Sequence, residues 1–84
     1  MHELSLMNSV VEAVESVARD TQAKRVVKIS LNVGKRNGAV EELLEFAFEA
    51  LVQDNPLLEG AKLDIQFTEG RGIDINSIEI EEST

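Results

Sequence analysis

The spacing of apolar residues changes between the first and the second segment of the chain. From Leu4 to about Thr21 apolar residues recur at helical spacing, whereas from Arg25 to Val33 every second residue is apolar. The helical positions are Met7, Val10, Val14 and Val17, flanked by Leu6, Val11 and Ala18. The alternating positions are Val27, Ile29, Leu31 and Val33. The pattern predicts an amphipathic helix followed by a strand with one buried face.

A second helix is predicted from about Val40 to Gln53. Its apolar surface is wide enough to cover a sheet or a partner on more than one side, and it comprises Leu43, Leu44, Phe46, Ala47, Phe48, Leu51 and Val52. The helix ends before Pro56, because proline lacks a backbone donor and restricts the residue before it. After Gly60 a strand is predicted, in which Leu63, Ile65 and Phe67 alternate with polar residues. We interpret Phe46, Phe48 and Phe67 as core residues.

The last apolar segment changes phase in its middle. Ile73 and Ile75 lie in one phase and Ile78 and Ile80 in the other, so a β-bulge at Asn76-Ser77 would return all four to one face. The tail from 79 to 84 is acidic and is expected to fray. The connection Glu69–Gly72 is short enough for a hairpin turn if the two strands that it joins are neighbours.

The predicted order is therefore helix, strand, helix, strand, strand. This indicates an α+β fold in a single domain over residues 1–84, with two helices packed on a three-stranded mixed sheet. The glycine-bracketed basic loop 34–38 lacks the pattern of a phosphate-binding loop. Its Lys35 and Arg36 are either a docking point for an acidic partner or a solvated loop.

Composition narrows the function. The 84 residues include 16 acidic and 8 basic side chains, a net charge of -8 that disfavours nucleic-acid binding. No cysteine is present, which excludes disulfides and thiolate-bound zinc. No segment is apolar enough to cross a membrane or to act as a signal peptide, so we expect a cytoplasmic protein.

The most informative chemistry lies in Met1-His2-Glu3. The terminal amine, the His2 amide and the His2 imidazole can close fused chelate rings around one metal ion, and the Glu3 amide is a possible fourth nitrogen. Such a planar nitrogen set suits Ni(II) or Cu(II). Because these nitrogens must lose protons, metal binding should weaken as the pH falls towards 6.5 and below.

Other candidate groups are weaker. The carboxylate pairs Glu41/Glu45 and Glu45/Glu49 have helical spacing but are typical of a solvated helix face. The serines of the first helix have no base beside them in the sequence, so nucleophilic catalysis is not indicated. We therefore do not expect an enzyme.

Several segments together resemble the HypA/HybF family of hydrogenase-maturation nickel chaperones. They are Met1-His2-Glu3-Leu4-Ser5, the strand from Arg25 to Gly34, the helix piece Leu44 to Glu49, the segment Leu58 to Ile65 and the closing Ser77 to Glu82, and they span the chain in the family's order. The resemblance implies that Met1, His2 and Glu3 bind Ni(II), with His2 as the essential ligand. It also implies delivery to the large subunit of a [NiFe] hydrogenase together with a HypB-type GTPase.

One departure from the family pattern is large. The family normally inserts a zinc-binding subdomain with paired CxxC segments between its last two strands, where this chain has only Glu69–Gly72. No zinc is therefore expected, and the chain is either an engineered deletion or a natural zinc-less relative. Exchange of the last strand between two chains is a route to a homodimer if the connection cannot close within one chain. The alternative function is a metal-free interaction module that docks a maturation GTPase or a hydrogenase subunit.

Overall fold

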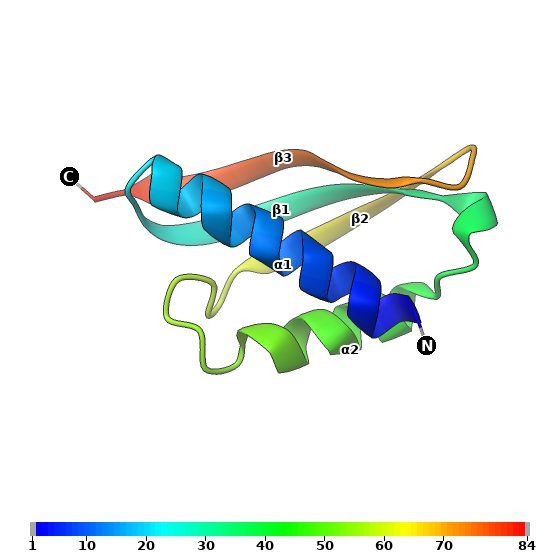
Figure 1. The fold of residues 1–84 in the computed structure, drawn as a ribbon, viewed down its shortest axis with the longest axis horizontal. Coiled ribbons are helices and arrows are strands. Elements are labelled where there is room, and N and C mark those ends of the chain that lie inside the picture. Colours follow the sequence, from blue (N-terminus) through cyan, green and yellow to red (C-terminus); the bar gives the residue numbers. More distant parts are fainter. Residues whose placement is uncertain (1, 84) are drawn as a thin grey trace.

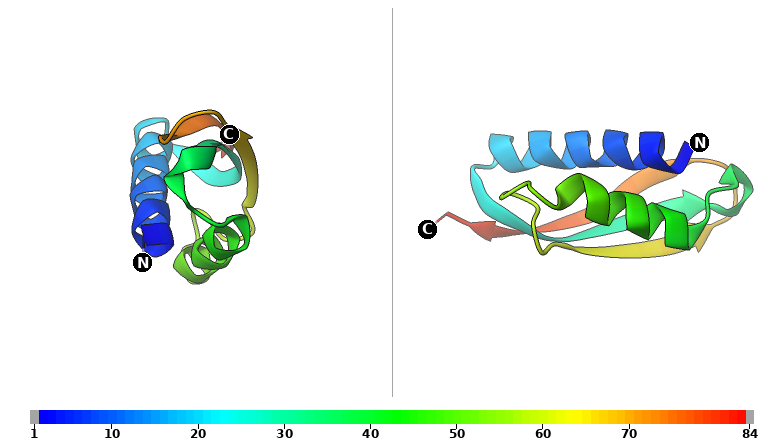
Figure 2. Two further views of the ribbon diagram at one scale, coloured as in Figure 1. Left: turned by 90° about the vertical axis from the view of Figure 1, so that its right-hand side faces the viewer. Right: turned by 90° about the horizontal axis from the view of Figure 1, so that it is seen from below.

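The fold consists of two helices on one face of a three-stranded sheet (Figures 1 and 2). The computed structural model describes residues 2–83, and of His2 it describes the backbone alone. The elements are α1 (His2–Asp20), β1 (Ala23–Gly34), the 3-10 helix η1 (Lys35–Asn37), α2 (Glu41–Val52), β2 (Lys62–Thr68) and β3 (Ile73–Glu82). This arrangement confirms the predicted α+β class and the predicted order of elements.

Strand β1 lies at the centre of the sheet, which has the order β2-β1-β3. It pairs parallel with β2 and antiparallel with β3, so the sheet is mixed as predicted. Since β2 and β3 occupy opposite edges, the connection Glu69–Gly72 is not a hairpin turn. It instead crosses the end of β1. The central place of β1 has a physical reason: its fully buried apolar row packs against both edge strands.

The crossing is tied to the end of β1 by backbone hydrogen bonds. The Gly34 N–H donates to the Gly72 carbonyl at 2.7 Å, and the Arg36 N–H donates to the Gly70 carbonyl at 2.7 Å. The side-chain amide of Asn37 donates to the Arg71 carbonyl at 2.9 Å. The basic loop that follows β1 therefore packs on the connection. Its Lys35 lies 3.4 Å from the Glu69 carboxylate at an exposed position.

The predicted bulge in β3 is confirmed. Ser30 pairs with Ser77 and Leu31 pairs with Ile75, which leaves Asn76 as the additional residue. All four isoleucines of β3 consequently pack against the core, namely Ile73, Ile75, Ile78 and Ile80.

A second bulge lies in β1, where the sequence pattern indicated regular alternation. Val26 pairs with Ile80 and Lys28 pairs with Glu79, so Val27 is additional on the β1 side. Val26 is fully buried and Val27 only partly so. Placing Val27 in the buried row was therefore wrong: two adjacent valines carry no signal of which one points inward, and only the pairing with β3 decides it.

Each helix buries a narrower stripe than its apolar residues predicted. The buried positions are Met7, Val10, Val11, Val14 and Ala18 in α1, and Leu44, Ala47, Phe48 and Val52 in α2. Val17 is 43% exposed and Phe46 is 70% exposed, so the interpretation of Phe46 as a core residue was wrong. A helix that packs on one layer presents one face to it, and Phe46 lies on a different face of α2.

Residues 79–82 belong to a strand, although their acidic composition suggested fraying. Strand β3 continues to Glu82, with Ala23 opposite Glu82 and Arg25 opposite Glu81. The Arg25 Nε–H donates to Glu81 at 2.6 Å, and Lys24 Nζ lies 3.5 Å from the same carboxylate. The prediction of fraying was therefore wrong for residues 79–82, because pairing to β1 and these cations hold them.

The Glu81 carboxylate predicts a small dependence of stability on pH. The hydrogen bond from Arg25, aided by the charge of Lys24, holds the pKa of Glu81 below its ordinary value of 4.5. A lowered pKa in the folded state stabilises the protein above pH 4.5, and this contribution is lost as the pH falls through the folded-state pKa. We expect Glu81→Gln to lower the free energy of unfolding in urea more at pH 7 than at pH 3. Glu79→Gln, at an exposed position of the same strand, is the control; equal losses at both pH values would contradict the assignment.

Candidate metal centre at the start of the first helix

The chain begins its first helix two residues earlier than expected, at His2 instead of Leu4. His2 and Glu3 therefore lie in the first turn of α1 and not ahead of it. An acidic residue in the first turn favours this early start, because it meets the positive end of the helix dipole. Met1 and the His2 side chain lie outside the described residues, so the proposed amine and imidazole ligands remain predictions.

The backbone conformation of the first turn determines how close its nitrogens are to a chelating geometry. The N–H groups at the start of a helix lie outside its internal hydrogen-bond ladder. A planar chelate ring formed by two successive backbone nitrogens needs the torsion ψ between them near zero, whereas a helix holds ψ at about −42°. A rotation of roughly 40° about ψ of His2 would bring the His2 and Glu3 nitrogens into the chelating geometry.

The Glu3 side chain takes no part in the proposed chelation and is buried in the fold. It is only 6% exposed, and its Oε2 accepts a hydrogen bond from the Val40 N–H at 3.2 Å. Figure 1 shows the start of α1 beside the start of α2. The Glu3 carboxylate therefore joins the two helix beginnings, while the Glu3 amide stays in the first turn of α1.

This contact supplies a cap that α2 cannot make from its own residues. Val40 is the N-cap residue of α2 and has no side-chain oxygen, and Leu43 occupies the third helical position, where a capping-box glutamate would stand. Glu3 makes the same bond to the N-cap N–H from a different helix. Sequence reasoning identified Glu3 through its amide only, and no local signal indicated the capping role of its carboxylate.

We expect Glu3→Ala to lower the free energy of unfolding by about 1–3 kcal/mol, because the partly buried Val40 N–H loses its acceptor. Glu3→Gln should cost less, since an amide oxygen still accepts that bond without the charge. Chemical denaturation measures both losses. Glu12→Ala, at an exposed position of the same helix, is the matched control, and a Glu3→Ala variant as stable as this control would contradict the capping role.

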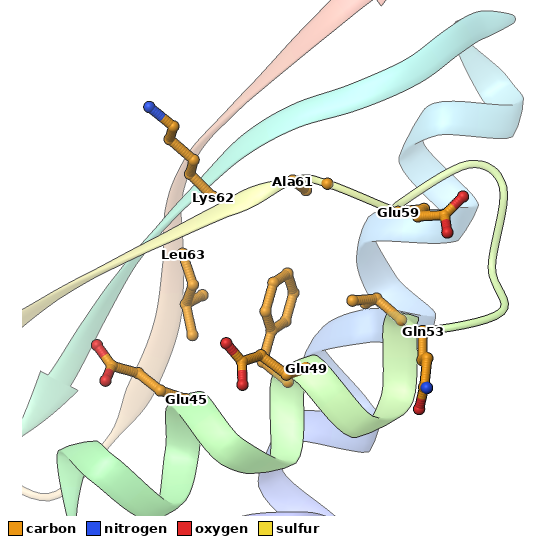
Figure 3. A pocket seen from close by; sticks show the side chains of 10 residues that line it. Glu45, Glu49, Gln53, Glu59, Ala61, Lys62 and Leu63 are labelled. Carbon is orange, nitrogen blue, oxygen red and sulfur yellow. The ribbon is translucent and has the colours of Figure 1, made fainter.

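The remaining polar candidates do not form a second site. Glu41, Glu45 and Glu49 are exposed on α2, in agreement with the solvated face predicted for them. Glu45, Glu49 and Lys62 border a cavity between α2 and β2. The Lys62 side chain points away from both carboxylates (Figure 3). The arrangement brings no acid and base together.

Among residues 3–83, whose side chains the structure describes, no cluster of three or more cysteine, aspartate or glutamate side chains has the arrangement to hold a metal ion. Neither described helix is long and apolar enough to cross a membrane.

Comparison with known proteins gives a consistent result. A family model described as hydrogenase/urease nickel incorporation, metallochaperone, hypA matches residues 1–80. The hydrogenase maturation factor HypA of Geobacter metallireducens is 44% identical over 72 residues, which are 86% of this chain and 62% of that protein. Its counterpart from Chlorobaculum tepidum is 44% identical over 86% of this chain and 63% of its own length. The chain thus spans less than two thirds of these relatives.

Solved structures share the fold at lower identity. The solution structure of the Ni metallochaperone HypA from Helicobacter pylori superimposes with a TM-score of 0.88 at 20% identity, over 99% of this chain and 100% of the other. A second solution structure, of HypA protein, gives a TM-score of 0.80 at 20% identity, over 95% and 96% of the two chains. At this level of identity the likeness establishes the architecture of helices and sheet.

Proposed function

Because this chain belongs to the HypA family, we propose that it is a nickel carrier that holds one Ni(II) at its N-terminus. The proposed ligands are the Met1 amine, the amide and imidazole nitrogens of His2 and the Glu3 amide. The observation that supports the proposal most is the family match, which begins at residue 1 and so includes these three residues. Ni(II) is the cargo of the carrier and not a structural component.

The first turn of α1 suits reversible binding. The N–H groups at the start of a helix lie outside its internal hydrogen-bond ladder. The Glu3 carboxylate, bonded to Val40, anchors the turn at one point, so that the residues before it can rotate around the metal without detaching α1 from α2. A planar nitrogen site at a chain end leaves the axial positions of the metal open, and an acceptor protein can therefore approach the ion.

We propose that delivery serves the maturation of a [NiFe] hydrogenase in the cytoplasm. The relatives are named hydrogenase maturation factors, and a maturation factor requires a protein to mature. The partners proposed here are a HypB-type GTPase and the hydrogenase large subunit. In this scheme the chain carries and transfers an ion without catalysing a reaction.

We also propose that the connection Glu69–Gly72 stands where the family's zinc-binding subdomain is inserted. The relatives are longer than this chain, and the chain has no cysteine to bind zinc as thiolate. The connection joins strands at opposite edges of the sheet. Residues 1–84 would then form a single nickel-binding domain in which the crossing over β1 replaces the inserted module.

A titration of the purified chain, with a free Met1 amine, by Ni(II) at pH 7.5 tests the proposal. We monitor the titration by visible absorption and expect a yellow, diamagnetic complex at one metal per chain. A planar nitrogen set around Ni(II) gives a low-spin ion, which accounts for both properties. A paramagnetic complex, or no complex at micromolar protein concentration, would overturn the assignment of the ligands. The metal-free interaction module is the second candidate, and the exposed Phe46 favours it.

A further inference from the structure

The two helices form an exposed apolar groove close to the start of the chain. It is lined by Glu3, Leu4, Leu43, Phe46, Ala47 and Ala50, and we call it the α1–α2 groove. Leu4 and Leu43 are each 48% exposed and Phe46 is 70% exposed. The enclosed space is about 320 Å³, at the small end for a ligand pocket, and it suits protein side chains better than a cofactor.

The exposed residues of α2 in this groove form a second helical stripe, separate from the buried one. Leu43, Phe46 and Ala50 are spaced by three and four residues, which places them along one side of the helix. The core of the domain uses Leu44, Ala47, Phe48 and Val52. A phenylalanine that contributes little to the core and stays in contact with water is typical of an interaction surface.

The charges around the groove indicate what covers it. Helix α2 contains four glutamates and no basic residue. Glu42 and Glu49 stand four residues before and three residues after Phe46, so both lie next to its ring on the helix surface. A second copy of the chain would bring another acidic helix against this rim, and the net charge of -8 opposes such an approach.

We propose that the α1–α2 groove docks a basic amphipathic helix of a partner protein. Apolar side chains of that helix enter the groove beside Phe46, and its lysine or arginine side chains face Glu42 and Glu49. Helix-in-groove binding uses anchors at the same three- and four-residue spacing as the exposed stripe on α2. The complementary charges steer the encounter and set the register.

The position of the groove connects docking with the proposed metal centre. Glu3 is one of the residues that line the groove, and its amide belongs to the proposed metal centre. A partner seated in the groove therefore lies next to the first turn of α1, from which the ion must leave. The statement that docking serves metal transfer depends on the proposed function, whereas the docking surface itself does not.

The test uses the whole chain and two synthetic peptides of equal length. Both peptides carry the same apolar stripe at three- and four-residue spacing; the flanking positions are lysine in one and glutamate in the other. Fluorescence anisotropy measures their affinities, and NMR shifts of the backbone amides locate the contact. We expect the lysine peptide to bind at least about tenfold more tightly, with shifts gathered at Leu4, Leu43, Phe46 and Ala50.

Matched variants separate the groove from the rest of the surface. Phe46→Ser should weaken binding of the lysine peptide about tenfold or more, while Val17→Ser, at an exposed apolar position further along α1, should leave it unchanged. Glu49→Lys should reduce the preference for the lysine peptide, and Glu12→Lys, with the same change of net charge, should reduce it much less.

Several results would overturn the proposal. They are equal affinity for the two peptides, no binding of either, shifts outside the groove, and a loss in Val17→Ser as large as in Phe46→Ser. A dimer that Phe46→Ser abolishes in analytical ultracentrifugation would assign the groove to a second copy instead. Ni(II) titration separates the two proposals: unchanged nickel affinity with lost docking in Phe46→Ser supports both, whereas an unmodified chain that docks the lysine peptide but binds no Ni(II) refutes only the nickel site.

Discussion

Replacement of His2 by alanine is expected to lower the affinity for Ni(II) by at least about 100-fold, which is roughly 2.7 kcal/mol of binding free energy. The variant loses the imidazole and with it one of the fused chelate rings. The Met1 amine and the amides must then hold the ion by themselves, and the amides deprotonate less readily without the imidazole to hold the metal in place. Isothermal titration calorimetry measures the loss. Retained Ni(II) binding in His2→Ala would refute the assignment.

Acetylation of the Met1 amine is expected to have a similar effect for a different reason. The modification leaves His2 intact but converts the amine into an amide, which no longer supplies the basic nitrogen that closes the first ring. Amidation of the carboxylate at Thr84, the other end of the chain, is the matched control and should leave nickel affinity unchanged. Neither change should alter thermal stability, since the Glu3 contact with Val40 persists in both. Unchanged affinity in the acetylated chain would show that the amine is not a ligand.

Replacement of Gly34 by alanine is expected to lower the free energy of unfolding by about 1–3 kcal/mol. A Cβ at this position would lie 2.5 Å from the Gly70 carbonyl oxygen and 2.6 Å from the Arg71 nitrogen. Both are backbone atoms of the crossing connection, so no side-chain rotation relieves the overlap. The connection must move away from β1, which weakens the bond from the Gly34 N–H to Gly72. A fall in Tm of about 4–8 °C per kcal/mol is expected for a domain of this size.

Gly72→Ala provides the matched control, because it lies in the same connection and a Cβ there meets no atom within 4 Å. Its stability should equal that of the unmodified chain or exceed it slightly, since alanine restricts the unfolded state. Equal stability of Gly34→Ala and Gly72→Ala would show that the crossing is not tight. The oligomeric state of Gly34→Ala is also informative: exchange of β3 between two chains removes the need for the crossing and would appear as a dimer in analytical ultracentrifugation.

Local patterns in the sequence were sufficient for the elements and for part of their register. The bulge at Asn76 followed from four isoleucines in two phases, because only one arrangement buries them all. The bulge at Val27 did not follow, since Val26 and Val27 are equally apolar. The sequence analysis also did not predict that residues 79–82 form a strand. Glu81 accepts a hydrogen bond from Arg25, which lies 56 positions away in the chain, and composition alone does not indicate that pairing.

The sequence by itself determined the α+β class, the order of the elements and the candidate nickel ligands, because periodicity and the chemistry of Met1-His2-Glu3 are properties of neighbouring residues. The tertiary structure decided that β1 separates β2 from β3, that the Glu3 carboxylate caps α2, and that Phe46 faces outward. Each of these depends on which surfaces meet when distant segments pack. An amphipathic pattern states how much apolar surface a helix has, and only the packed fold determines which part of it is left for a partner.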